Sequence, residues 1–72
     1  MKIIIEIHHL PSNTDYPSDS QEMNQSELDL LLETLSHVDK LNYFKMPVYG
    51  SLTIFNKYIL KDCVITITKE KA

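Results

Sequence analysis

The feature that most constrains the fold is the one stretch with a sustained helical period, residues 26–44, which lies between two strand-like ends. Apolar residues recur in it at three- and four-residue spacing, which places them along one stripe of a helix. The stripe consists of Leu28, Leu31, Leu32, Leu35 and Val38. Ser26 and Asp29 have the spacing of a capping box, so the helix is expected to begin at Ser26. An amphipathic helix must bury its stripe against another element, and a sheet is the natural partner.

A second apolar flank would exist on the same helix, about 140° from the first stripe, if the helix runs its full length. This flank consists of Met23, Leu30, His37, Leu41 and Phe44. An apolar flank that the sheet leaves uncovered is typical of an interface, so these residues predict a homo-oligomer contact. In the alternative, the helix ends near Lys40, and Leu41 and Phe44 fold back into the core.

The two ends of the chain read as strands because apolar and polar residues alternate there. Residues 2–10 place three isoleucines on one face, and residues 63–69 repeat the pattern. Two shorter strands, 52–55 and 58–60, are expected between them, joined by a turn at residues 56–57. A rival interpretation joins residues 58–69 into one long strand with a bulge.

The chain is therefore predicted to be a single α+β domain, residues 1–72, with element order β-α-β-β and a further strand in one interpretation. Its parts are an acidic loop (11–25), the helix (26–44) and a β-hairpin or meander (48–69). One helix is expected to pack on one face of a mostly antiparallel sheet. The predicted core consists of Ile3, Ile5, Ile7, Leu28, Leu31, Leu32, Leu35, Val38, Leu52, Ile54, Cys63, Ile65 and Ile67. The other sheet face would be open or paired with a second chain.

Charge is distributed unevenly along the chain. Residues 11–39 contain seven acidic and no basic residues, whereas residues 40–72 contain six lysines and two acidic residues. The loop and helix are therefore expected to form one negative surface, which is either a solvated face or a docking surface for a basic partner. The predicted partner-binding residues are Asp15, Tyr16, Asp19, Glu22, Glu27 and Glu33. Tyr16 is expected either to contact the partner or to pack inward and anchor the loop.

Direct nucleic-acid binding is disfavoured, because all seven basic residues are lysine and arginine is the usual reader of phosphate and guanine. The lysines of the C-terminal half are better explained as guards of exposed strand edges. A weak nucleic-acid binder that uses this lysine-bearing hairpin is the third alternative.

Residues suited to catalysis or to cofactor binding are sparse. One glycine cannot build a phosphate-binding loop. His8 and His9 would point to opposite faces of a strand, so they cannot both bind one metal ion, and the single cysteine has no partner at metal-ligand spacing. A domain of this size is also expected to leave little room for a cleft of about 300 Å³ or more. We therefore predict no enzyme activity, no cofactor and no metal site. The lone cysteine and the absence of a long apolar stretch predict a cytoplasmic protein outside the membrane.

In size and acidic charge the chain resembles the very small proteins that phages and mobile elements encode to block host defence complexes, anti-CRISPR proteins among them. It shares no motif with them. The sequence thus predicts a non-enzymatic interaction protein that docks on a larger protein or ribonucleoprotein with a basic surface, most concretely an inhibitor of a nucleic-acid-handling complex. The alternative is a homodimer or larger homo-oligomer that associates through the second helix flank or an open sheet edge.

Overall fold

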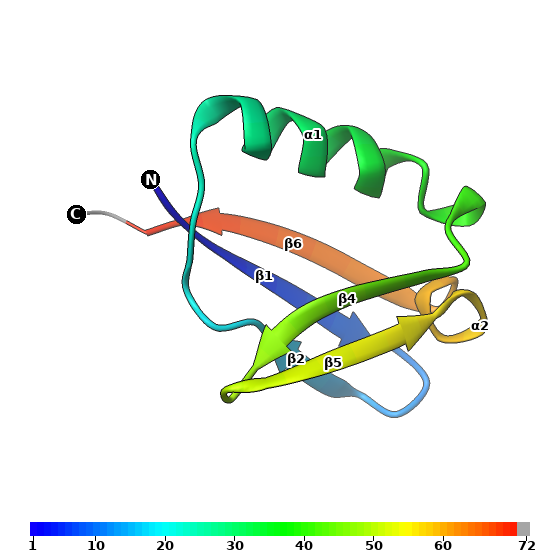
Figure 1. Cartoon of the computed structure of the whole chain (residues 1–72). Helices are drawn as coiled ribbons and strands as arrows, with labels where there is room; N and C mark the ends of the chain where they lie inside the picture. The colour runs from blue at the N-terminus through cyan, green and yellow to red at the C-terminus, as the bar shows by residue number, and fades with distance from the viewer. Residues whose placement is uncertain (71–72) are drawn as a thin grey trace.

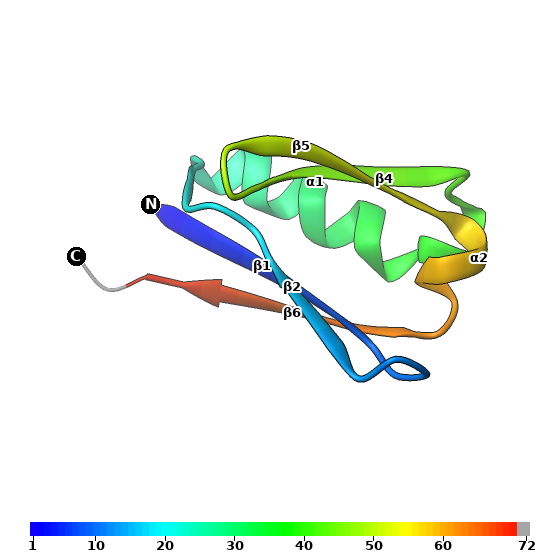
Figure 2. The ribbon, with the colours of Figure 1, turned by 90° about the horizontal axis from the view of Figure 1, so that it is seen from below.

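The computed structural model describes residues 1–70 and shows two layers, one formed by a sheet and the other by a helix and a hairpin lying side by side (Figures 1 and 2). The predicted α+β class, with one main helix and mostly antiparallel strands, is confirmed. The elements are β1 (Lys2–His9), β2 (Thr14–Pro17), β3 (Gln21–Glu22), α1 (Gln25–Ser36), the 3-10 turn η1 (Val38–Lys40), β4 (Tyr43–Val48), β5 (Ser51–Asn56), α2 (Lys57–Leu60) and β6 (Cys63–Lys69).

The larger sheet is centred on β1. Strand β6 pairs antiparallel with one edge of β1, while β2 and β3 follow one another along the opposite edge. Ser18 bridges the break between these two short strands: its N–H donates to the Ile5 carbonyl oxygen (2.7 Å), and its hydroxyl accepts the Ile5 N–H (2.8 Å). The region predicted as a loop, residues 11–25, is thus partly strand, because it lies along β1.

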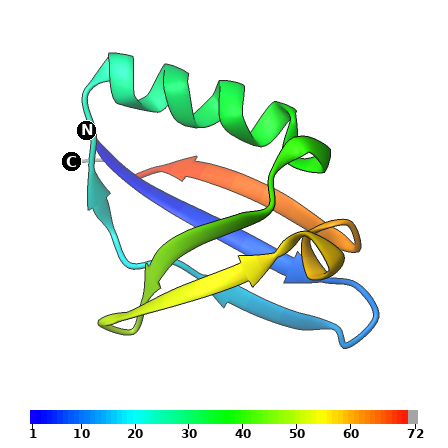
Figure 3. The ribbon, with the colours of Figure 1, turned by 45° about the vertical axis from the view of Figure 1, so that its right-hand side comes forward.

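The second layer consists of α1 and the antiparallel hairpin β4–β5, which cover the same face of the larger sheet (Figures 2 and 3). The core between the layers takes three isoleucines from β1, one leucine from α1 and four residues from β4, β5 and α2. These residues are Ile3, Ile5, Ile7, Leu28, Met46, Val48, Phe55 and Leu60. Of the predicted core, Leu32, Leu52 and Ile54 are exposed, so their assignment was wrong.

Helix α1 differs from its prediction at both ends. It begins after Asn24, whose side-chain oxygen accepts the Glu27 N–H (2.8 Å), while the Glu27 carboxylate accepts the Asn24 N–H (3.0 Å). This is a complete capping box two residues before the predicted one. The helix ends at Ser36 rather than at residue 44, because His37 leaves the helical region with φ −120° and ψ 42°.

The segment after the helix was assigned wrongly in two places. Met46 and Pro47 do not end a helix but lie in β4, where they pair with β5. Residues 58–60 form a helical turn instead of a strand, because the Asn56 side-chain oxygen accepts the N–H groups of Tyr58 (3.0 Å) and Ile59 (3.1 Å) and so caps α2. The strand predicted at residues 63–69 is confirmed as β6.

Candidate interaction surfaces

Asp15 and Tyr16 are neighbours on β2 and point to opposite faces of the sheet. The carboxylate of Asp15 contacts the His8 imidazole on the open face. The ring of Tyr16 points inward and lies edge-on against Phe55, with a centroid distance of 5.3 Å. Tyr16 therefore anchors β2 to the core and does not present its ring to a partner, which is the alternative that the sequence left open.

Asp19 is occupied by the tip of the β4–β5 hairpin. Its two carboxylate oxygens accept the N–H groups of Tyr49 (2.9 Å) and Gly50 (2.8 Å), and its own N–H donates to the Pro47 carbonyl oxygen (2.8 Å). Both tip residues have positive φ, 51° for Tyr49 and 78° for Gly50. The two-residue turn between paired strands thus has the conformation typical of a tight hairpin. Asp19 stabilises this turn, so a basic partner would have to compete with the N–H groups of the turn for the Asp19 carboxylate.

Glu22 and Glu27, two more of the predicted contact residues, also have internal partners. The Met1 ammonium group donates to the Glu22 carboxylate (2.8 Å), and this hydrogen bond holds the pKa of that carboxyl below its usual range. Glu27 accepts the Asn24 N–H in the capping box. Both side chains remain solvent-accessible, so each holds structure and adds negative charge to the surface.

On the outward side of α1, carboxylates lie beside an apolar side chain, and the helix has no lysine or arginine. Glu27, Asp29 and Glu33 are exposed, and α1 contains no lysine. Leu30 lies among them at helical spacing and is 68% exposed. The four residues Glu27, Asp29, Leu30 and Glu33 are called the α1 acidic face below.

No lysine of residues 1–70 lies within 4.0 Å of a carboxylate of those residues. Short-range pairs between lysines and carboxylates therefore do not neutralise the acidic half of the described chain. The close contacts of carboxylates with basic groups that do occur there involve the Met1 ammonium group, the His8 ring and the His37 ring.

The predicted oligomer flank does not form one face. Met23 precedes α1 and packs on the core, His37 caps the helix end, and Leu41 follows η1. Phe44 lies in β4 and packs against the core. Because the helix stops at Ser36, the period that would align these residues is broken, and Leu30 alone remains on an exposed helical surface.

The outer side of the hairpin is an apolar surface that the sequence prediction missed. Cross-strand register places Tyr43, Lys45 and Pro47 of β4 beside Leu52, Ile54 and Asn56 of β5 on this side. Leu52 and Ile54 are each 63% exposed and Tyr43 is 54% exposed. Residues 52–55 are apolar or β-branched on both faces, so alternation alone could not show which pair points outward. This surface is called the hairpin face below.

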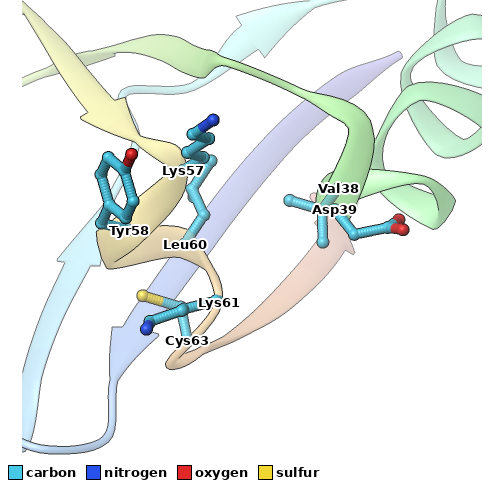
Figure 4. A pocket seen from close by; sticks show the side chains of 7 residues that line it. All are labelled: Val38, Asp39, Lys57, Tyr58, Leu60, Lys61 and Cys63. Atoms are coloured by element: carbon cyan, nitrogen blue, oxygen red, sulfur yellow. The ribbon is translucent and has the colours of Figure 1, made fainter.

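A pocket of about 490 Å³ opens where η1, α2 and the start of β6 meet (Figure 4). It is lined by Val38, Asp39, Lys57, Tyr58, Leu60, Lys61 and Cys63. The expectation that so small a domain leaves little room for a cleft of about 300 Å³ or more was therefore wrong. Histidine is not among these lining residues. The Cys63 thiol donates to the Ile59 carbonyl oxygen (3.1 Å). Burial, and then the charge of Asp62, raises the pKa of the Cys63 thiol, which keeps it in the less nucleophilic form.

Within residues 1–70, histidine, cysteine and carboxylate side chains do not come together in threes as a metal site requires. The longest helix of these residues, α1, is too short and too polar to cross a bilayer. Comparison with protein-family models, with curated proteins and with solved structures finds no match to this chain.

Proposed function

We propose that this chain is a protein–protein interaction module that acts by binding, without catalysis, and that the α1 acidic face docks on a basic surface of a larger protein or ribonucleoprotein. The observation that carries the proposal is Leu30, 68% exposed and surrounded by carboxylates on a helix without a base. An exposed leucine supplies apolar area for a contact, while the surrounding charges steer a basic partner and exclude an acidic one.

The most concrete form of this proposal is a phage-type inhibitor of a host defence complex, in the manner of anti-CRISPR proteins, or of another nucleic-acid-handling complex. Such complexes hold nucleic acid in positively charged channels. A compact body whose helix carries carboxylates without a lysine partner suits the covering of such a channel. This activity would take place in the cytoplasm, where those complexes work.

The test is affinity capture from a host lysate with the wild-type chain and with the variant Asp29→Lys/Glu33→Lys. Asp29 accepts one hydrogen bond from Gln25, and Glu33 lies 3.4 Å from His37, so both are exposed residues with only local contacts. Glu27 is left intact because it belongs to the capping box. We expect the variant to lose a basic, nucleic-acid-handling partner that the wild-type chain retains, and added salt to weaken the wild-type complex.

The matched control reverses two acidic residues away from α1, Asp62→Lys/Glu70→Lys. Both residues are exposed and lie outside α1. Because this variant also replaces two carboxylates with two lysines, it changes the net charge by the same amount. Equal loss of the partner by both double variants would show a dependence on net charge alone. Equal retention by both would contradict docking through the α1 acidic face.

A second candidate function is a homo-oligomeric accessory subunit. The helix flank predicted for it is absent as a single face, but the open sheet edge is present. Among residues 1–70, β5 pairs with β4 alone, so its other edge is open to a second chain.

A further inference from the structure

Among the described residues, 1–70, the hairpin β4–β5 leaves one edge of β5 free. Figure 1 shows β4 between α1 and β5, which places β5 at the outside of this layer, and the register places β4 on its one paired side. The Lys57 N–H donates toward this paired side, to the Asn42 carbonyl oxygen (3.1 Å). Because successive backbone groups of a strand point to alternate edges, the N–H and C=O groups of Leu52 and Ile54 point to the free edge.

This free edge lacks the devices that usually prevent strands from pairing with another chain. Residues 51–56 contain no charge and no proline. By contrast, the outer strand β2 carries Asp15 and ends in Pro17, and β6 ends in Lys69. Charged residues and prolines are the common guards of exposed edges, so β5 is the one unguarded edge among these three.

The side chains next to this edge are apolar and exposed. Leu52 and Ile54 project from the hairpin face and are each 63% exposed. An isolated two-stranded sheet is marginally stable, and added strands extend its hydrogen bonding and its apolar cover. The β5 edge therefore offers both halves of a strand-pairing interface, backbone groups and apolar side chains.

We propose that two copies of this chain pair antiparallel through β5 and form a continuous four-stranded sheet from their two hairpins. A two-fold axis at Thr53 places Leu52 of each copy opposite Ile54 of the other. This register keeps each outward side chain beside an outward side chain, as strand pairing requires. The four residues then form one apolar cluster across the axis. The interface is separate from the α1 acidic face, so the proposal rests on the second candidate function above and not on docking to a basic partner.

Charge favours the antiparallel arrangement over a parallel one. Lys57 follows one end of β5, and its ammonium group lies over the Tyr58 ring, 5.3 Å from the centroid. At the other end, the hairpin tip holds the Asp19 carboxylate. An antiparallel pair brings Lys57 of each copy toward the tip of the other, whereas a parallel pair would bring the two lysines together.

The first test is sedimentation of the full chain from about 1 μM to about 1 mM. We expect a concentration-dependent dimer that Ile54→Lys weakens at least about tenfold, because the change removes a cross-strand contact and places like charges at the axis. The matched control is Val64→Lys, at a residue 51% exposed on the other sheet. It should leave the dimer intact, as should Asp29→Lys/Glu33→Lys.

The second test fixes the register by cross-linking in a Cys63→Ser background, where the chain has no other thiol. Thr53→Cys should form a disulfide-linked dimer under mild oxidation, because the axis places two copies of this residue opposite each other. Ser51→Cys is the control, since the same register places it opposite Phe55 of the other copy.

A wild-type chain that stays monomeric up to about 1 mM overturns the proposal. So does unchanged association of Ile54→Lys, or cross-linking at Ser51 but not at Thr53. Retention of single-stranded DNA by a monomeric chain would also overturn it, in favour of a nucleic-acid surface.

Discussion

The ring of Tyr16 meets the ring of Phe55 edge-on, with 5.3 Å between centroids and 73° between planes. Tyr16 belongs to the larger sheet and Phe55 to the hairpin, so the contact joins the two layers of the molecule. Phe55 is 3% exposed. An aromatic that sequence reasoning offered as a partner contact thus serves to hold the hairpin on the sheet.

The first prediction concerns the energy of this pair. Phe55→Ala is expected to reduce the free energy of unfolding by about 3–5 kcal/mol, the usual cost of truncating a buried aromatic side chain. A double-mutant cycle with Tyr16→Leu and Phe55→Leu should give a coupling energy of about 0.5–1.5 kcal/mol in urea denaturation. The control cycle pairs Tyr16→Leu with Tyr58→Leu, at a residue 68% exposed, and should be additive. Additive effects for Tyr16 and Phe55 would contradict the contact.

The strands at the two ends could be predicted from the sequence because one face of each is apolar throughout and the other is mixed. Ile3, Ile5 and Ile7 alternate with Ile4, Glu6 and His8, and burial follows the alternation. The hairpin could not be predicted in the same way. Leu41 and Phe44 continue the helical spacing of α1, so the period alone could not reveal that Phe44 belongs to a strand. Tertiary packing of the hairpin on the core decided the outcome.

The candidate surfaces were predictable only in part. The run of carboxylates without a lysine correctly indicated exposed acidic residues on α1. The internal partners of Asp19 and Glu22 could not be predicted, because they lie 30 and 21 residues away along the chain, at Tyr49 and Met1. The hairpin face was missed because both sides of residues 52–55 carry apolar or β-branched residues, and only the register with β4 decides which side is buried.

The second prediction distinguishes the observed helix cap from the predicted one. Asn24→Ala should cost about 1 kcal/mol of stability, because the N–H of Glu27 loses its acceptor. Asn24→Ser should restore most of that stability, since serine also caps well. Ser26→Ala is the matched control and should change the free energy of unfolding by less than about 0.5 kcal/mol. Urea denaturation measures the loss of stability in each variant. A larger loss for Ser26→Ala than for Asn24→Ala would show that Ser26, and not Asn24, caps the helix.

The third prediction concerns the hairpin tip. Tyr49 has a φ of 51°, a strained conformation for a residue with a side chain. The residue is 84% exposed, so burial of its ring does not offset this strain. Tyr49→Asn should raise the free energy of unfolding by about 0.5–1 kcal/mol, because asparagine before glycine suits this turn. Tyr58→Asn, at an exposed residue of α2 with no positive φ, should bring no such gain.

Asp19→Ala tests the same turn from its other side and is the fourth prediction. The change leaves the N–H groups of Tyr49 and Gly50 without their carboxylate acceptor, at a cost of about 1.5–3 kcal/mol. Asp29→Ala is the control on an exposed helical residue and should cost less than about 0.5 kcal/mol. Thermal or urea unfolding of both variants checks the difference, and equal stability of the two would show that the carboxylate does not hold the tip.

The last prediction is the pH dependence of the Cys63 thiol. Burial is the larger cause that raises its pKa, and the charge of Asp62 is the smaller one. Both oppose the thiolate, so the folded chain should be alkylated more slowly than the unfolded chain over the whole range in which an ordinary thiol ionises. Because the folded pKa lies above the unfolded one, the unfolded thiol loses its proton first as the pH rises, and this group makes the fold less stable above its ordinary pKa. Rates of alkylation across pH, in buffer and in urea, measure both pKa values. Asp62→Asn should lower the pKa of the folded chain only slightly, and a folded pKa at or below the unfolded one would contradict the half-buried placement of the thiol in the pocket wall.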